Sequence, residues 1–142
     1  MNKSAFILDP RIANDTFFLL DAPLCRVGLM DDARFPWLIL VPCVPLVREW
    51  PDLSSIQQVQ LQVEINAAAR ALQQAFPSGE KLNIAALGNV VPQLHIHVVL
   101  RHIDDAAWPK PIWGVGEREP YSKETALQTS SAIMAFWDLS DD

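Results

Sequence analysis

Two of the chain's three histidines stand two residues apart in the segment 93–99, which reads Gln-Leu-His-Ile-His-Val-Val. The alternation with apolar residues predicts a strand in which Gln93, His95 and His97 share one face. An imidazole has an unperturbed pKa near ~6.5, so it can act as a nucleophile or as an acid near neutral pH. Two imidazoles on one strand face are close enough to act on a single reacting group.

Two other interpretations of this pair are open. A His-x-His pair on a strand can be ordinary polar surface without any function. Two imidazoles can also share a zinc ion, which needs a third and usually a fourth ligand. The sequence offers no obvious further ligand nearby, although His102 or an acidic residue from elsewhere could supply one. We therefore expect neither a metal site nor a cofactor.

The elements that must position the histidines are visible as local patterns. We predict strands over residues 16–20, 24–30, 37–41, 82–87 and 94–101, with a hairpin turn over 31–36. A long helix is predicted over 54–76, capped by Asp52 or Ser54 and ended by Pro77 and Gly79. Its apolar stripe comprises Leu61, Ile65, Ala68, Leu72 and Phe76, widened by Val59 and Val63.

Shorter elements flank this region. Pro10 suits the start of a short helix over 9–15, and a second helix is predicted over 122–139 with Ala126, Ile133 and Phe136 among its apolar positions. The prolines of the aromatic arm 108–114 exclude both a helix and a central strand there. Consecutive strands with helices outside them indicate an antiparallel α+β fold, as one domain over residues 1–142.

Composition and charge limit the classes of partner that the chain is expected to bind. The chain has 142 residues, of which 50% are hydrophobic, and a net charge of −6. This charge argues against nonspecific binding to nucleic acid or to an anionic membrane, but it does not exclude a small anionic substrate. No segment resembles a targeting signal or a membrane span, so we expect a cytoplasmic protein. Cys25 and Cys43 form no C-x-x-C pattern, and we interpret them as reduced, buried residues.

The histidine segment resembles the signature of the histidine triad (HIT) family, in which three histidines alternate with apolar residues. The similarity extends to the hairpin, the long helix and residues 83–101, about half of the chain. The segments 31–37 (Asp-Asp-Ala-Arg-Phe-Pro-Trp) and 87–92 (Leu-Gly-Asn-Val-Val-Pro) resemble a bacterial branch of that family. The resemblance implies an antiparallel sheet of about five strands with the long helix packed on one face.

The resemblance also implies an activity. Family members cleave nucleotide conjugates at the α-phosphate, as hydrolases or nucleotidyl transferases. His95 matches the family's nucleophile, which forms a covalent nucleotidyl-imidazole intermediate. His97 matches the last histidine, which hydrogen-bonds the phosphate or the leaving group. Dinucleoside polyphosphates and nucleoside phosphoramidates both remain possible substrates.

Further roles follow from the same resemblance. Asn83, Gly88 and Asn89 lie at positions similar to the phosphate-contacting loop, and Asp31 or Asp32 resembles the residue that accepts the ribose hydroxyls. Each of these residues can instead be an ordinary residue of a turn or a strand end, without a role in binding. The resemblance also implies a homodimer formed through the long helix and a neighbouring strand.

One departure from the family bears on the mechanism. Gln93 stands where the family has its first histidine, which orients the nucleophile, and Val90 stands where some members have a hydroxyl residue. The Gln93 amide can make hydrogen bonds, and we expect it to act as the third catalytic residue by orienting His95. The amide cannot carry a proton charge. The alternative function is therefore a nucleotide-binding module with little or no turnover.

Overall fold

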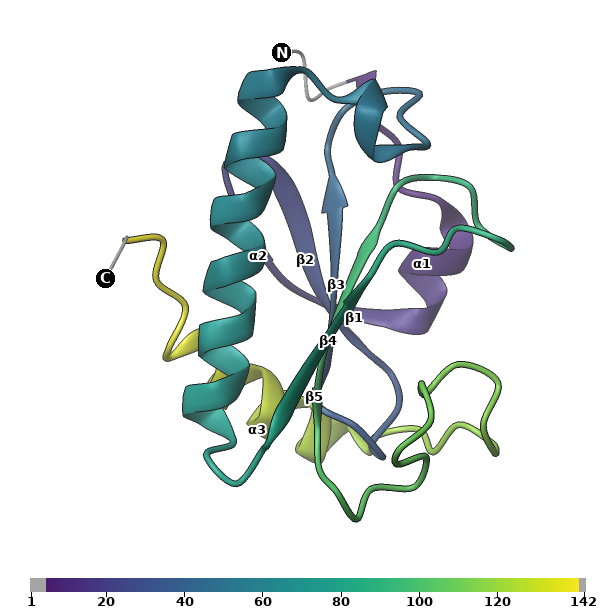
Figure 1. Cartoon of the computed structure of the whole chain (residues 1–142), viewed down its shortest axis with the longest axis vertical. Coiled ribbons are helices and arrows are strands. Elements are labelled where there is room, and N and C mark those ends of the chain that lie inside the picture. The colour runs from purple at the N-terminus through teal and green to yellow at the C-terminus, as the bar shows by residue number, and fades with distance from the viewer. Residues whose placement is uncertain (1–4, 141–142) are drawn as a thin grey trace.

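The computed structural model describes residues 5–140 and shows a five-stranded antiparallel sheet (Figure 1). The strands are β1 (Thr16–Asp21), β2 (Cys25–Met30), β3 (Trp37–Pro42), β4 (Lys81–Ala85) and β5 (Ile96–Arg101), in the order β1-β2-β3-β5-β4. The helices are α1 (Pro10–Asp15), α2 (Ser55–Ala75) and α3 (Lys123–Met134), with a 3-10 turn at Trp50–Asp52. The predicted α+β class is confirmed.

The long helix α2 forms where its pattern predicts it. Ser54 caps it by accepting a hydrogen bond from the backbone N–H of Gln57, and Pro77 follows its end. Leu61, Ile65, Ala68 and Leu72 are buried, as the stripe predicts. Val59 was expected to widen this stripe, but that prediction is wrong, because its side chain is 63% exposed.

Two apolar clusters lie on the two faces of the sheet. The face covered by α2 carries the larger cluster, which includes Leu38, Leu40, Ile96 and Val98. The opposite face carries α1 and the C-terminal arm, and Figure 1 shows α1 and α2 on opposite sides of the sheet. Its cluster comprises Ile12, Phe35, Trp37, Ile39, Val41, Val99, Ala107 and Ile112. His97 pairs with Ile39 of β3, so it belongs to this second face.

Several element ends differ from the predicted ones. Strand β5 begins at Ile96, so that His95 lies just before the strand, and β4 ends at Ala85 instead of residue 87. Helix α3 ends at Met134, five residues earlier than predicted, and Phe136 beyond it is 44% exposed. No helix within residues 5–140 combines the length and apolar character needed to cross a membrane.

Candidate active site

His95 is held by the main chain at the entrance to β5. Its Nδ1 atom lies 2.7 Å from the carbonyl oxygen of Gln93. A carbonyl only accepts hydrogen bonds, so Nδ1 carries the proton and donates it to this contact. In the neutral ring, the lone pair is then on Nε2. The half-buried His95 side chain thus offers, in its neutral form, an unprotonated nitrogen of the kind that a nucleophilic imidazole needs.

His97 has a different protonation pattern. Its Nδ1 atom lies 3.1 Å from the indole Nε1 of Trp37, and an indole N–H can only donate. Nδ1 must therefore be the acceptor, and the ring proton is on Nε2. Burial of the side chain, together with the nearby His95, lowers the pKa of His97 to about 3. His97 is thus a neutral hydrogen-bond donor throughout the physiological pH range.

Aromatic rings hold this pair in place. The ring centroids of His95 and His97 are 5.0 Å apart, and His97 contacts Trp37 at 5.7 Å and Trp113 at 5.1 Å. Trp113 comes from the C-terminal arm and meets Trp37 edge-on at 6.3 Å. Sequence reasoning missed both tryptophans as site residues. No local signal could have found them, because their contacts depend on the β3–β5 register and on the path of the arm.

The hydrogen bonds of the Gln93 amide go to the N-terminal segment of the described chain and not to His95. Its Oε1 accepts a hydrogen bond of 2.9 Å from the backbone N–H of Asp9, and its Nε2 donates one of 2.8 Å to the carbonyl of Ile7. The expectation that the amide orients the nucleophile therefore differs from the observed contacts, since the main-chain carbonyl of the same residue makes that hydrogen bond. The amide instead attaches the N-terminal segment to the loop that carries His95.

This N-terminal segment, residues 7–11, has a second attachment to the same loop. Arg11 donates a hydrogen bond of 3.1 Å to the carbonyl of Val90 and forms an ion pair of 2.9 Å with Asp9. The hydrogen bonds from Arg11 hold the pKa of Asp9 below its usual value, with a smaller contribution from His95. The segment therefore places a charged pair near His95.

His95 lies between two small hollows. The first has a volume of about 70 Å³ and the second about 100 Å³. Besides His95, the first is lined by Arg11, Ile12, Asp15, Thr16, Met30, Ile39 and Val91. The second is lined by Arg48, Glu49, Trp50, Pro51, Ala86, Leu87, Gly88 and Leu94.

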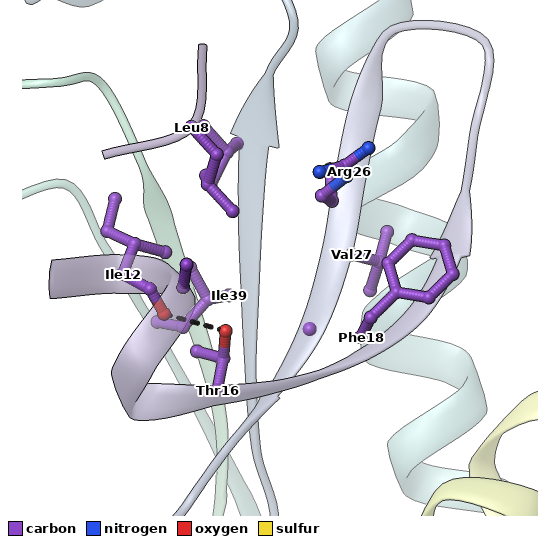
Figure 2. Close-up of a pocket in the computed structure, with 10 residues that line it drawn as sticks. Leu8, Ile12, Thr16, Phe18, Arg26, Val27 and Ile39 are labelled. Atoms are coloured by element: carbon purple, nitrogen blue, oxygen red, sulfur yellow. Dashed lines mark hydrogen bonds between the residues drawn. The ribbon is translucent and has the colours of Figure 1, made fainter. Parts of the chain in front are cut away.

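A larger, mostly apolar hollow of about 300 Å³ adjoins the first one (Figure 2). The two hollows share three lining residues, Ile12, Thr16 and Ile39, and are therefore adjacent. His95 lines only the smaller one. In Figure 2, Leu8 and Ile12 lie on one side of the larger hollow, and Phe18 and Arg26 lie on the other. Its floor is on the same sheet face as His97, since Gly28, Ile39 and His97 are paired across β2, β3 and β5.

The other candidate residues are distributed over the molecule. Gly88, with φ of +72°, lines a hollow together with His95, and Asn89 follows it as an exposed residue. Asn83 lies on β4 opposite Val99, and its Oδ1 accepts a hydrogen bond of 2.9 Å from Arg101. The structure thus brings Gly88 close to His95, whereas the amide oxygen of Asn83 is hydrogen-bonded to Arg101 at the end of β5.

The two aspartates after β2 contact the chain itself. Asp31 accepts a hydrogen bond of 2.8 Å from the backbone N–H of Tyr121 and lies 3.5 Å from Arg118. Asp32 is buried and paired with Arg34 at 2.8 Å. Both carboxylates therefore stabilise the hairpin turn and the C-terminal segment. Within residues 5–140, no group of three or more His, Cys, Asp or Glu residues is arranged to hold a metal ion.

Comparisons with known proteins agree with this geometry. The family model described as the HIT domain matches residues 11–103. A solved histidine triad protein from Bradyrhizobium japonicum is 43% identical, with a TM-score of 0.91 over 94% of this chain and 98% of that one. A histidine triad protein from Sinorhizobium meliloti is 40% identical, with a TM-score of 0.92 over 95% of this chain and 99% of that one. One from Marinobacter aquaeolei is 41% identical, with a TM-score of 0.90 over 94% of this chain and 96% of that one. No match was found among curated proteins.

Proposed function

The chain belongs to the HIT domain family, a family of nucleotide-binding hydrolases and transferases, and on that premise we propose that it cleaves nucleotide conjugates at the α-phosphate through a covalent intermediate on His95. The observation that carries the proposal is the pairing of two defined tautomers. His95 presents a lone pair on Nε2, and His97 presents an N–H on its own Nε2 beside it. One ring can attack phosphorus while the other donates a hydrogen bond to the phosphate.

The reaction would proceed in two displacements. Nε2 of His95 bonds to the α-phosphorus, and the bond to the leaving group breaks with its electron pair on the leaving atom. The nucleotidyl-imidazole is then cationic, because Nδ1 keeps the proton that it donates to the Gln93 carbonyl. Water next attacks phosphorus, and His95 leaves as a neutral imidazole while the water proton passes to solvent. The product is a nucleoside monophosphate.

The hollows suggest how the nucleotide is placed. The apolar hollow of about 300 Å³ is within the range of small-molecule sites, and we assign the base to it. The adjoining hollow would hold the ribose, and Gly88 would let the backbone approach the phosphate oxygens. A panel of dinucleoside polyphosphates, phosphoramidates and other nucleotide conjugates, incubated with the protein and separated by chromatography, tests the proposal. Release of a nucleoside monophosphate from none of them would favour the binding module.

Replacement of Gln93 tests what its amide does. Gln93→Leu removes two hydrogen bonds worth roughly 1 kcal/mol each, so we expect the N-terminal segment to loosen and nucleotide affinity to fall about ten- to thirtyfold. The value of kcat should change little, because the carbonyl that orients His95 remains. Hydrogen exchange of residues 5–12, nucleotide Kd and kcat are the measurements.

A matched control for this variant is Gln128→Leu, which replaces an exposed glutamine on α3. It should leave both exchange and affinity unchanged. A Gln93→Leu variant that loses kcat while its nucleotide affinity stays at the wild-type value would show that the amide acts on His95 after all, as the family resemblance implied.

The surface of α2 and β4 supports a homodimer. Ile56 and Val59 of α2 are 83% and 63% exposed, Ile84 of β4 is 50% exposed, and β4 is an edge strand. An unpaired strand edge and an exposed apolar helix face are surfaces that proteins usually cover. We therefore propose that two copies associate through α2 and β4.

Light scattering tests this assembly. We expect a mass of about twice the 15.9 kDa of one chain, and a lower mass for Val59→Lys. Leu127→Lys, at a 68% exposed position on α3, is the matched control and should stay dimeric. A mass of one chain at all concentrations would contradict the dimer.

A further inference from the structure

The proposed reaction does not specify which leaving groups the site accepts. That selectivity depends on whether the leaving group must be protonated as its bond to phosphorus breaks. When the bond to phosphorus breaks, a phosphate departs as a stable anion and needs no proton. The nitrogen of a phosphoramidate departs as an amine only if an acid protonates it. The selectivity of the site therefore depends on whether a group beside His95 can act as that acid.

His97 is the nearest candidate, and Trp37 prevents it from being one. A protonated His97 would carry a proton on Nδ1, directed at the indole N–H that lies 3.1 Å away. Neither ring can easily turn to avoid this clash of two donors, since Trp37 is 8% exposed and His97 is 5% exposed. Trp113 packs against both rings from the C-terminal arm. The neutral ring of His97 is a hydrogen-bond donor but a very weak acid.

No other group beside the nucleophile takes its place. The Gln93 side chain is an amide, which carries no titratable proton. Asp9 is ion-paired with Arg11, whose hydrogen bonds hold the pKa of that carboxyl low. The remaining acidic residues in the two hollows, Asp15 and Glu49, are exposed to water. The site thus supplies donors for phosphate oxygens without supplying an acid.

We propose that Trp37 makes this site selective for conjugates whose leaving group departs as an anion, namely phosphoanhydrides, over phosphoramidates. This inference rests on the proposed hydrolase function. In the favoured reaction, the bond between phosphorus and His95 Nε2 forms and the anhydride P–O bond breaks, with the electron pair on the departing phosphate oxygen. His97 Nε2–H keeps its proton throughout and hydrogen-bonds an oxygen of the transferred phosphoryl group. Trp37 is a positioning residue, because it acts through His97.

The test compares two substrates that share one nucleoside, a dinucleoside triphosphate and a nucleoside phosphoramidate of a simple amine. For the wild-type protein we expect kcat/KM to favour the anhydride by about a hundredfold or more, since general acid catalysis is typically worth 10²–10⁴-fold. Trp37→Phe removes the indole N–H and keeps an aromatic ring. It should narrow this preference by roughly tenfold, and more at lower pH, because the indole N–H no longer opposes a proton on Nδ1, while burial and His95 continue to disfavour it.

Trp137→Phe is the control, since this tryptophan packs against the cluster on the other face of the sheet. It should leave the preference unchanged. Nitrogen-15 NMR of His97 gives a readout that does not depend on turnover. In the wild-type protein, Nδ1 should stay unprotonated as the pH is lowered to about 5. In Trp37→Phe, the same nitrogen should already become protonated before the pH has fallen that far.

The outcomes separate this inference from the function on which it rests. Comparable kcat/KM values for the two substrates in the wild-type protein, or an NMR spectrum with a protonated Nδ1 at neutral pH, would overturn the inference alone. An unchanged preference in a folded Trp37→Phe variant would also overturn it. Absence of any turnover by the wild-type protein would reject the proposed hydrolase and the inference together.

Discussion

His95→Ala is expected to abolish turnover while nucleoside monophosphate binding stays measurable. The variant removes the only side chain in residues 5–140 that combines a free imidazole nitrogen with contact to both small hollows. Loss of a covalent nucleophile typically lowers kcat by on the order of 10⁴-fold or more. The walls that would hold the nucleotide are built from other residues, so binding and chemistry should separate.

Two measurements make this prediction decisive. Calorimetry with a nucleoside monophosphate should give similar dissociation constants for the wild-type protein and the variant. Trapping with a rapid quench that avoids acid should show one nucleotidyl group on His95, because phosphorus–nitrogen bonds are acid-labile. His102→Ala is the matched control, since this third histidine lines neither hollow and should retain full activity. An unchanged rate in His95→Ala would end the covalent hypothesis.

Asp105→Asn is expected to lower the free energy of unfolding by about 3–5 kcal/mol, as is usual when one partner of a buried ion pair is removed. Arg101 and Asp105 are 1% and 5% exposed, and they form two parallel contacts of 2.6 and 2.9 Å. Asp105 also accepts hydrogen bonds from the backbone N–H groups of His102, Ala107 and Trp108. The substitution leaves the guanidinium buried without its counter-charge.

This pair also connects stability to the site. Burial raises the pKa of Asp105, but the hydrogen bonds from Arg101 and the backbone outweigh it and lower the pKa to about 2. The folded state is therefore stabilised above pH ~4, the unfolded pKa, and this contribution is lost as the pH falls toward 2. Because Asp105 also accepts a hydrogen bond from the backbone N–H of Trp108, the first residue of the arm that carries Trp113, we expect activity to fall together with stability.

Urea unfolding followed by circular dichroism measures the effect. Asp104→Asn, at the exposed neighbouring position, is the matched control and should change the free energy of unfolding by less than about 0.5 kcal/mol. If both variants unfolded at the same urea concentration, the buried pair would not be a main determinant of stability. Between pH ~4 and 2, the free energy of unfolding should also fall less steeply with pH in Asp105→Asn than in the wild-type protein.

Local periodicity was enough to predict the fold class and to place the two histidines of segment 93–99 on one face. The alternation over residues 94–101 gave His95 and His97 a common face, and the 3.6-residue stripe identified the long helix that covers the other face. These features are readable because side-chain direction within one element depends only on its backbone period. Gly88 was singled out differently, by its residue type and by the resemblance to the family's phosphate-contacting loop, and the structure gives it a positive φ of 72°.

The protonation states of the site were decided by tertiary contacts. The indole that fixes the His97 tautomer is 60 residues away in sequence, and the groups that hold the Gln93 amide are 84 and 86 residues away. Strand order and register place these groups, and they result from packing over the whole sheet, whereas a local pattern specifies only which face a residue occupies. The residue types at positions 95 and 97 are the basis of the proposed chemistry, and long-range packing sets which nitrogen of the His97 ring accepts a hydrogen bond.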